Sequence, residues 1–177
     1  MNRSPLTIVL LCLVGTILWR TMHWYPQLPD RIVLHMNGSG APDGWTGKSI
    51  AAWSLLPMIG LGLSVVLFAL AAWMEGSAAY SLHSVNVPDK KRFLALPIEA
   101  RRTVLMPTAI YLRSVAILIL LLFGYILEGL ARTSLGTHTH WPAWPVLVFV
   151  LIVLLGIVPL QRSTRKAMDR AKLQPSD

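Results

Sequence analysis

Charged residues are scarce in this chain of 177 residues. Asp, Glu, Lys and Arg make up 14% of it, whereas about 25% is ordinary for a soluble domain. Because a soluble protein needs charges to cover its surface, this scarcity and the 54% of apolar residues exclude a disordered chain and a soluble nucleic-acid binder. Cysteine is scarcer still. Cys12 is alone, so an intramolecular disulfide, a disulfide-stapled secreted scaffold and a cysteine-based metal site are excluded.

Four long apolar runs are present, each close to the roughly 20 residues that a helix needs to cross a bilayer. They cover residues 5–22, 52–74, 108–129 and 144–160. Trp53 and Trp73 bracket the second run, as aromatic side chains at two membrane interfaces would. No small-residue cleavage site follows the first run, so we expect a retained helix and not a cleaved signal peptide. Pro57, Pro107 and Pro159 are expected near helix ends, where a missing N–H costs little.

The distribution of basic residues predicts the orientation. With the N-terminus in the cytoplasm, eleven basic residues lie on the inner side and four on the outer side. The inner set is Arg3, Lys90, Lys91, Arg92, Arg101, Arg102, Arg162, Arg165, Lys166, Arg170 and Lys172. The outer set is Arg20, Arg31, Lys48 and Arg132. Since cytoplasmic loops carry the basic excess, we expect a multi-pass protein of a bacterial cytoplasmic (inner) membrane with both termini in the cytoplasm. The net charge of +8 then needs no nucleic-acid partner.

The expected fold is therefore an all-α integral membrane protein with four transmembrane helices and a short structured outer loop between the first two. Residues 1–75 hold helix 1, the outer loop and helix 2, and residues 76–107 form a cytoplasmic loop. Residues 108–160 hold helices 3 and 4 with a short outer loop, and residues 161–177 form a basic cytoplasmic tail. The basic clusters of the loop and tail favour contact with anionic lipid, with docking of a cytoplasmic regulator as the alternative.

The first outer loop has the pattern of a strand followed by a turn. Residues 32–37 alternate in polarity and are rich in β-branched side chains. Asn37-Gly38, Gly40 and Pro42-Asp43-Gly44 then supply turn signals. We predict an extended piece, a tight glycine-rich turn and a return through Trp45 to the second helix.

The same loop carries a motif of spaced residues. Leu28-Pro29, His35, Asn37, Gly40, Asp43-Gly44 and Lys48 follow the pattern LP-x-x-x-x-x-H-x-N-x-x-G-x-x-D-x-x-x-x-K. In this, residues 5–75 resemble the N-terminal domain of unknown function of bacterial SdpI-type membrane proteins. The resemblance implies a binding role, immunity- or sensor-like, and brings no established catalytic residues. Longer members of the family have further helices that we do not expect here, so their particular role is not carried over.

Three interpretations of these loop residues stay open. In the structural one, the glycines and Pro42 shape the turn, Asp43 caps it and Lys48 extends to the membrane interface. In the catalytic one, His35 and Asp43 form an acid–base pair, which requires hydrogen-bond reach. In the recognition one, the loop forms a polar site for a peptide, a headgroup or an ion. The predicted ligand-binding residues are His35, Asn37, Gly40, Asp43, Gly44 and Lys48.

The histidines and one arginine are the remaining candidates. His138 and His140 form an H-x-H pair that could bind Zn or Cu with His23 or His35, but this motif is weak and no metal site is assigned. Arg113 lies within the third run, where a charge is costly. We favour snorkelling of its long side chain to the cytoplasmic headgroups, with pairing to Glu75 as the alternative. Glu128, about 22 Å further along the helix, is excluded as its partner.

The leading function is that of a non-enzymatic inner-membrane protein that binds a ligand or partner at its outer loop. The alternatives are an accessory structural subunit of a larger membrane protein complex and a metal-dependent membrane enzyme that uses the outer histidines. The expected partners are the lipid bilayer, other transmembrane proteins or a second copy of the chain, and a cytoplasmic regulator. The residues identify no cofactor.

Overall fold

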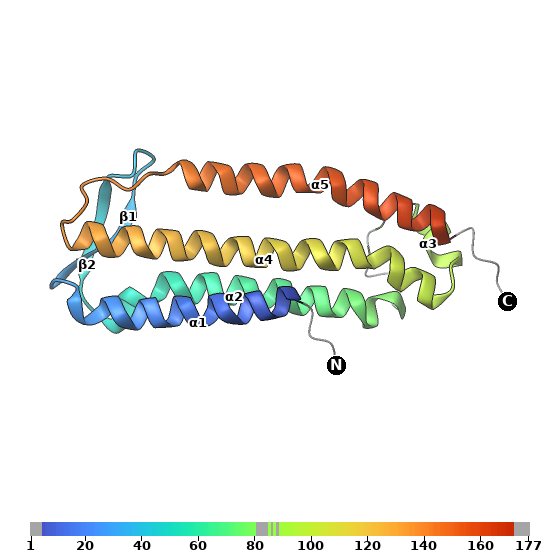
Figure 1. The fold of residues 1–177 in the computed structure, drawn as a ribbon, viewed down its shortest axis with the longest axis horizontal. Helices are drawn as coiled ribbons and strands as arrows, with labels where there is room; N and C mark the ends of the chain where they lie inside the picture. The colour runs from blue at the N-terminus through green and yellow to red at the C-terminus, as the bar shows by residue number, and fades with distance from the viewer. Residues whose placement is uncertain (1–4, 81–84, 86, 88, 172–177) are drawn as a thin grey trace. The chain divides into compact units, whose positions relative to one another are not determined.

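The computed structural model describes residues 5–80, 85, 87 and 89–171. Arg3 and Lys172 of the expected inner set, and the end of the expected tail, lie outside the described residues. Figure 1 shows the elements. They are α1 (Pro5–Trp24), the 3₁₀ turn η1 (Tyr25–Gln27), β1 (Arg31–Met36), β2 (Pro42–Gly47), α2 (Ile50–Glu75), the 3₁₀ turn η2 (Ser77–Tyr80), α3 (Lys90–Ala95), α4 (Ile98–Ser134) and α5 (Trp144–Ala171).

Four helices, α1, α2, α4 and α5, are long and apolar enough to cross a membrane. This confirms the expected fold class, an all-α membrane protein of four helices with a short structured loop between the first two. That loop forms a small two-stranded sheet. Two helices exceed the apolar runs. α4 begins at Ile98, well before Thr108, and α5 continues to Ala171, well beyond Leu160. Hydropathy marks only the part of a helix that lies in hydrocarbon, whereas backbone hydrogen bonding continues the helix into polar surroundings.

The expectation that three prolines lie near helix ends is wrong. Pro57, Pro107 and Pro159 lie inside α2, α4 and α5. Each proline removes one backbone hydrogen bond, but intact turns on both sides keep the helix continuous, and membrane helices tolerate such positions.

The chain forms two compact units. One comprises Met1–Val65 and Ala116–Leu151 and contains β1 and β2, and we name it the hairpin unit. The other comprises Val66–Val115 and Ile152–Asp177 and contains α3, and we name it the α3 unit.

The hairpin unit is held together by a small apolar core and a few buried hydrogen bonds. Trp53 on α2 is buried, and its Nε1 donates to the carbonyl of Thr21 on α1 at 2.8 Å. This tryptophan, which is expected to mark a membrane interface, packs in the core of the unit. The backbone N–H of Val33 on β1 donates to Oγ of Ser134 on α4 at 2.9 Å. The sheet therefore rests on the end of α4. The core residues are Leu28, Ile32, Val33, Trp53, Leu127, Leu130 and Ala131.

The α3 unit has its own core beside the basic cluster of the chain. Phe93 of α3 is buried, although lysines precede it and the segment was expected to be solvated or at the lipid surface. Arg101 holds this region together, because its guanidinium donates to the carbonyls of Leu94 at 2.6 Å, Leu96 at 2.9 Å and Ala79 at 3.3 Å. The core residues are Ala78, Ala79, Val85, Val87, Phe93, Leu96, Val104, Leu105 and Met168.

Candidate functional site

The expected strand and return in the first loop form an antiparallel hairpin. Arg31 pairs with Gly47, Val33 with Trp45 and Met36 with Pro42. The register shifts around His35, which lies opposite Gly44. A Cβ on Gly44 would come within 2.8 Å of the Cβ of His35, so glycine allows the two strands to approach here.

Asn37 organises the turn of the hairpin. Its Oδ1 accepts hydrogen bonds from the backbone N–H of Ser39 at 3.0 Å, the hydroxyl of Ser39 at 2.7 Å and the N–H of Ala41 at 3.1 Å. Asparagine at the start of a turn suits this role because its side chain bonds to the backbone two residues further on. The interpretation in which Asp43 caps the turn is therefore wrong, since Asp43 already lies on β2.

Gly40 joins the hairpin to residues 135–143, the segment between α4 and α5. Its φ of 82° lies in the left-handed region, and its carbonyl accepts from the N–H of Trp141 at 2.8 Å. A Cβ at this position would overlap the carbonyl of Trp141. Both the backbone conformation and the contact thus require glycine.

His35 and Asp43 form an exposed pair across the hairpin. His35 Nδ1 lies 2.5 Å from Asp43 Oδ1, and the two side chains are 71% and 42% exposed. A carboxylate on one ring nitrogen orients the imidazole and leaves the other nitrogen for a ligand. His35 Nε2 has no hydrogen-bond partner within the described chain. The reach that an acid–base pair requires is present, although proximity alone does not make the pair catalytic.

Lys48 does not join the other loop residues in one polar site. Its Nζ donates to the carbonyls of Leu28 at 2.6 Å and Pro26 at 3.4 Å and lies 5.2 Å from the centre of the Tyr25 ring. Lys48 therefore holds the chain between α1 and β1, and it is not simply an interfacial cation. Of the six predicted residues, His35 and Asp43 are brought together and Gly44 lies opposite His35. Asn37 and Gly40 form the turn, and Lys48 lies apart.

A pocket of about 270 Å³ lies between the hairpin and the helices of the hairpin unit. Its lining is mainly apolar, with His35 and Asn37 as polar side chains on the hairpin wall. The lining residues are Leu34, His35, Met36, Asn37 and Gly40 of the hairpin, Leu56 of α2, Tyr125, Ile126 and Leu130 of α4, and Trp141, Pro142, Ala143 and Val146.

Trp141 is the residue of this pocket that the sequence did not indicate. Its indole packs against the ring of Tyr125 at 5.2 Å and that of His138 at 5.5 Å. Gly129 makes room for it, since a Cβ there would lie 2.5 Å from the indole Cγ. Trp141 Nε1 is buried and has no hydrogen-bond partner in the part of the chain that is described. The Trp141-Pro142 pair follows two histidines in the sequence and could have drawn attention to this segment. Nothing in the sequence relates Trp141 to Gly40.

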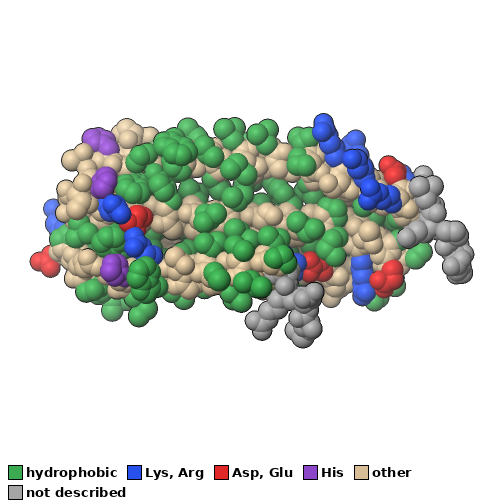
Figure 2. Space-filling model, in the orientation of Figure 1, with side chains coloured by type: hydrophobic (Ala, Val, Ile, Leu, Met, Phe, Trp, Pro, Cys, Tyr) green, Lys and Arg blue, Asp and Glu red, His purple; other side chains and the backbone are tan. Residues whose placement is uncertain are grey.

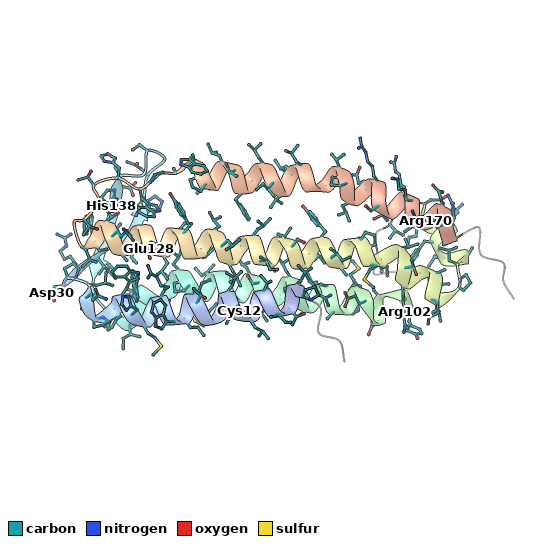
Figure 3. All side chains as sticks on the ribbon, viewed as in Figure 1. Cys12, Asp30, Arg102, Glu128, His138 and Arg170 are labelled. Atoms are coloured by element: carbon teal, nitrogen blue, oxygen red, sulfur yellow. The ribbon has the colours of Figure 1, made fainter. Side chains whose placement is uncertain are left out.

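Glu128, on α4, was also missed as a structural residue (Figure 3). Its carboxylate accepts from Arg20 and from Trp24 Nε1 at 3.0 Å, both on α1, and from Arg132 Nε at 2.7 Å. Arg20 also lies over the Trp24 ring, 5.1 Å from its centre. The sequence indicates this pair only by the position of Glu128 and Arg20, which are an acid and a base near the ends of two apolar runs.

Arg113 is paired in the α3 unit. Its NH1 and NH2 donate to the two carboxylate oxygens of Glu75 at 2.5 and 2.6 Å, and its side chain is only 14% exposed. The favoured snorkelling interpretation is wrong and the pairing alternative is right. Glu75 ends α2, so a carboxylate lies within reach of the guanidinium, and pairing lowers the cost of a charge in hydrocarbon.

The described histidines, His23, His35, His138 and His140, do not gather at one site. His23 stacks on Trp19 at 5.2 Å, and His138 and His140 contact the hydroxyls of neighbouring threonines. Within residues 5–80, 85, 87 and 89–171, no three His, Cys, Asp or Glu side chains gather as metal ligands.

Residues 6–61 match the family model of a domain of unknown function, DUF1648. The match covers α1, the hairpin and the beginning of α2. Neither a curated protein nor a solved structure matches the chain.

Proposed function

We propose that this chain is a non-enzymatic inner-membrane protein, immunity- or sensor-like, that binds a ligand in the pocket between the hairpin and Trp141. The pocket itself carries the proposal. Ligand sites are concave and mainly apolar, with a few polar groups that set orientation, and this pocket has that composition. Its volume of about 270 Å³ suits one large apolar side chain rather than a whole drug-sized molecule.

The chemistry of the lining favours a peptide as the ligand. An apolar or aromatic side chain would fill the space between Leu34, Leu130 and Val146. A peptide backbone would then find one exposed group with no partner among the described residues, the Nε2 of His35. A hydrogen bond to this nitrogen would set the orientation of the peptide, as the few polar groups of a mainly apolar site do.

The orientation and the family relation are part of the same proposal. The distribution of basic residues supports a hairpin that faces away from the cytoplasm, where a secreted peptide would meet it. The match of residues 6–61 to DUF1648 supports the relation to SdpI-type membrane proteins.

Two substitutions on adjacent residues of α5 test the pocket. Val146→Trp would fill it, whereas Leu147→Trp adds the same bulk to a side chain that is 67% exposed and does not line it. Purified variants are screened by thermal shift against short synthetic peptides that carry one aromatic or large aliphatic residue. We expect peptides that stabilise the native chain and Leu147→Trp but not Val146→Trp. Failure to find any peptide that discriminates between the two variants would refute the proposal.

A structural subunit is the second candidate, and α5 favours it. None of the membrane-length window of α5 is buried, against 11%, 22% and 17% in α1, α2 and α4, so this helix has the most surface left for another transmembrane protein. A subunit comigrates with a defined complex on gel filtration in mild detergent, whereas a separate binding protein migrates alone.

A further inference from the structure

A groove between α4 and α5 of the α3 unit has two chemically different ends. Its wide end is a pocket of about 540 Å³ lined by Thr103 and Met106 of α4 and by Ser163, Lys166 and Arg170 of α5. A second pocket of about 370 Å³ shares Pro107, Ile110 and Ser163 with the first and therefore continues it. The continuation is lined mainly by apolar groups, among them Pro159 and Leu160.

Two cations lie at the wide end and are available to a ligand. Lys166 and Arg170 are four residues apart and so share one face of α5, and Arg170 lies in its last turn (Figure 3). Figure 2 shows Lys and Arg side chains gathered over these last turns. The nearby carboxylate of Asp169 pairs with Arg92 at 2.8 Å. Neither Lys166 nor Arg170 has a carboxylate partner among the described residues.

The far end of the groove is closed by a fixed contact. The hydroxyl of Tyr111 on α4 donates to the carbonyl of Val153 on α5 at 2.7 Å. Beside it, Gly156 leaves space, because a Cβ there would lie 2.9 Å from the Tyr111 ring. From Lys166 to Gly156 the helix rises about 15 Å at 1.5 Å per residue. That length equals roughly half of a hydrocarbon core that is about 30 Å thick, which is one leaflet.

We propose that this groove is a binding site for one anionic phospholipid. The phosphate is held by Lys166 and Arg170 with the hydroxyl of Ser163, and an acyl chain lies along the apolar continuation toward Gly156. A soluble anion would use only the cationic end, and a lipid with a zwitterionic headgroup would bring its own cation against Lys166. Basic pockets between membrane helices on the cytoplasmic side bind anionic lipid headgroups elsewhere, and the predicted orientation puts this end there. This site is separate from the pocket at the hairpin, and its test is independent of that proposal.

The test is native mass spectrometry of the purified full chain in mild detergent. Phosphatidylglycerol, phosphatidylcholine and soluble glycerol 3-phosphate are added in separate titrations. We expect one phosphatidylglycerol to bind in preference to phosphatidylcholine, and glycerol 3-phosphate not to displace it. Saturation of the site by glycerol 3-phosphate would overturn the proposal, because it would indicate an anion site without a lipid chain.

Two matched double variants distinguish binding at this groove from general attraction of an anionic lipid to the positive charge of α5. Lys166→Gln with Arg170→Gln removes the cations of the groove, whereas Arg162→Gln with Arg165→Gln removes the same charge from the same helix outside it. We expect the first pair to weaken phosphatidylglycerol binding roughly 30-fold, because a basic residue near an anionic surface contributes a factor of about five, and the second pair to change it little. Equal effects of the two pairs would overturn the proposal. Circular dichroism confirms that each variant is folded.

A third variant tests the apolar half. Ser114 lines the continuation of the groove, and Ser114→Phe fills it while leaving both cations in place. We expect this variant to lose phosphatidylglycerol binding. If it binds as the native chain does, the acyl chain does not occupy the groove and the proposal fails. As a second readout, a phosphatidylglycerol with a diazirine at mid-chain is expected to label the peptides around Ser114 of α4 and Gly156 of α5. Labelling confined to α1 and α2 would contradict the site.

Discussion

Gly40→Ala tests whether the hairpin is held on the segment between α4 and α5. The substitution forces alanine into a φ of 82°, which costs about 1–2 kcal/mol for a residue with a Cβ. It also puts a methyl group where the carbonyl of Trp141 lies, so the hydrogen bond from Trp141 N–H to Gly40 O is lost, at about 1 kcal/mol. The two effects together weaken the contact by about 2–3 kcal/mol. The local opening constant then rises roughly 30- to 150-fold, since each 1.4 kcal/mol is a factor of ten.

Hydrogen exchange measures this opening directly. The amide of Trp141 is protected by its bond to Gly40, so its exchange in detergent reports how often the hairpin leaves the segment. Gly38→Ala is the matched control in the same turn, because a Cβ there has no atom within 4 Å and the φ of Gly38 is not positive. We expect faster exchange at Trp141 in Gly40→Ala and native exchange in Gly38→Ala. Equal exchange in both variants would show that Gly40 is not the point of attachment.

Three other substitutions test single interactions. Asn37→Ala removes the acceptor of three hydrogen bonds in the turn, so we expect about 1–2 kcal/mol less protection of the turn amides in hydrogen exchange, whereas Asn37→Asp keeps the acceptor and stays near native. Glu128→Gln removes the carboxylate that Arg20 and Arg132 share, and we expect the free energy of unfolding in detergent to fall by about 2 kcal/mol. An unchanged free energy of unfolding would mean that this cluster does not stabilise the fold. Glu75→Gln leaves the guanidinium of Arg113 without its carboxylate and should lower the free energy of unfolding by about 3 kcal/mol. Glu99→Gln breaks an exposed pair with Arg102 and should lower it by less than about 0.5 kcal/mol. Similar losses in the two variants would argue against a buried pair.

Much of the fold was predictable because its causes are local. A run of apolar residues must satisfy its own backbone in hydrocarbon, so composition alone located α1, α2, α4 and α5. The hairpin was predictable for a similar reason, since Asn37-Gly38 and the alternation before it act within a few residues. The helix limits were not, because α4 begins in a polar segment that hydropathy does not detect.

The candidate site was only partly predictable. The motif contains Asn37 and Gly40 as predicted ligand-binding residues, and in the structure both shape the turn through partners that folding brings to them. Lys48 could have bonded to a carboxylate, a headgroup or a carbonyl, and all three were compatible with its position in the sequence. In the structure it bonds to carbonyls twenty or more residues earlier in the chain.

Periodicity, hydropathy and turn chemistry are short-range properties, and they alone determined that this chain makes four membrane helices and one hairpin. Tertiary structure decided which charges meet: Arg113 with Glu75, Arg20 with Glu128, and His35 with Asp43. It also decided that Trp141 lies against Gly40, more than a hundred residues earlier. Such pairings are set by the packing of helices against one another. A pattern of residue types along the chain does not show which residues distant in sequence lie close together in space.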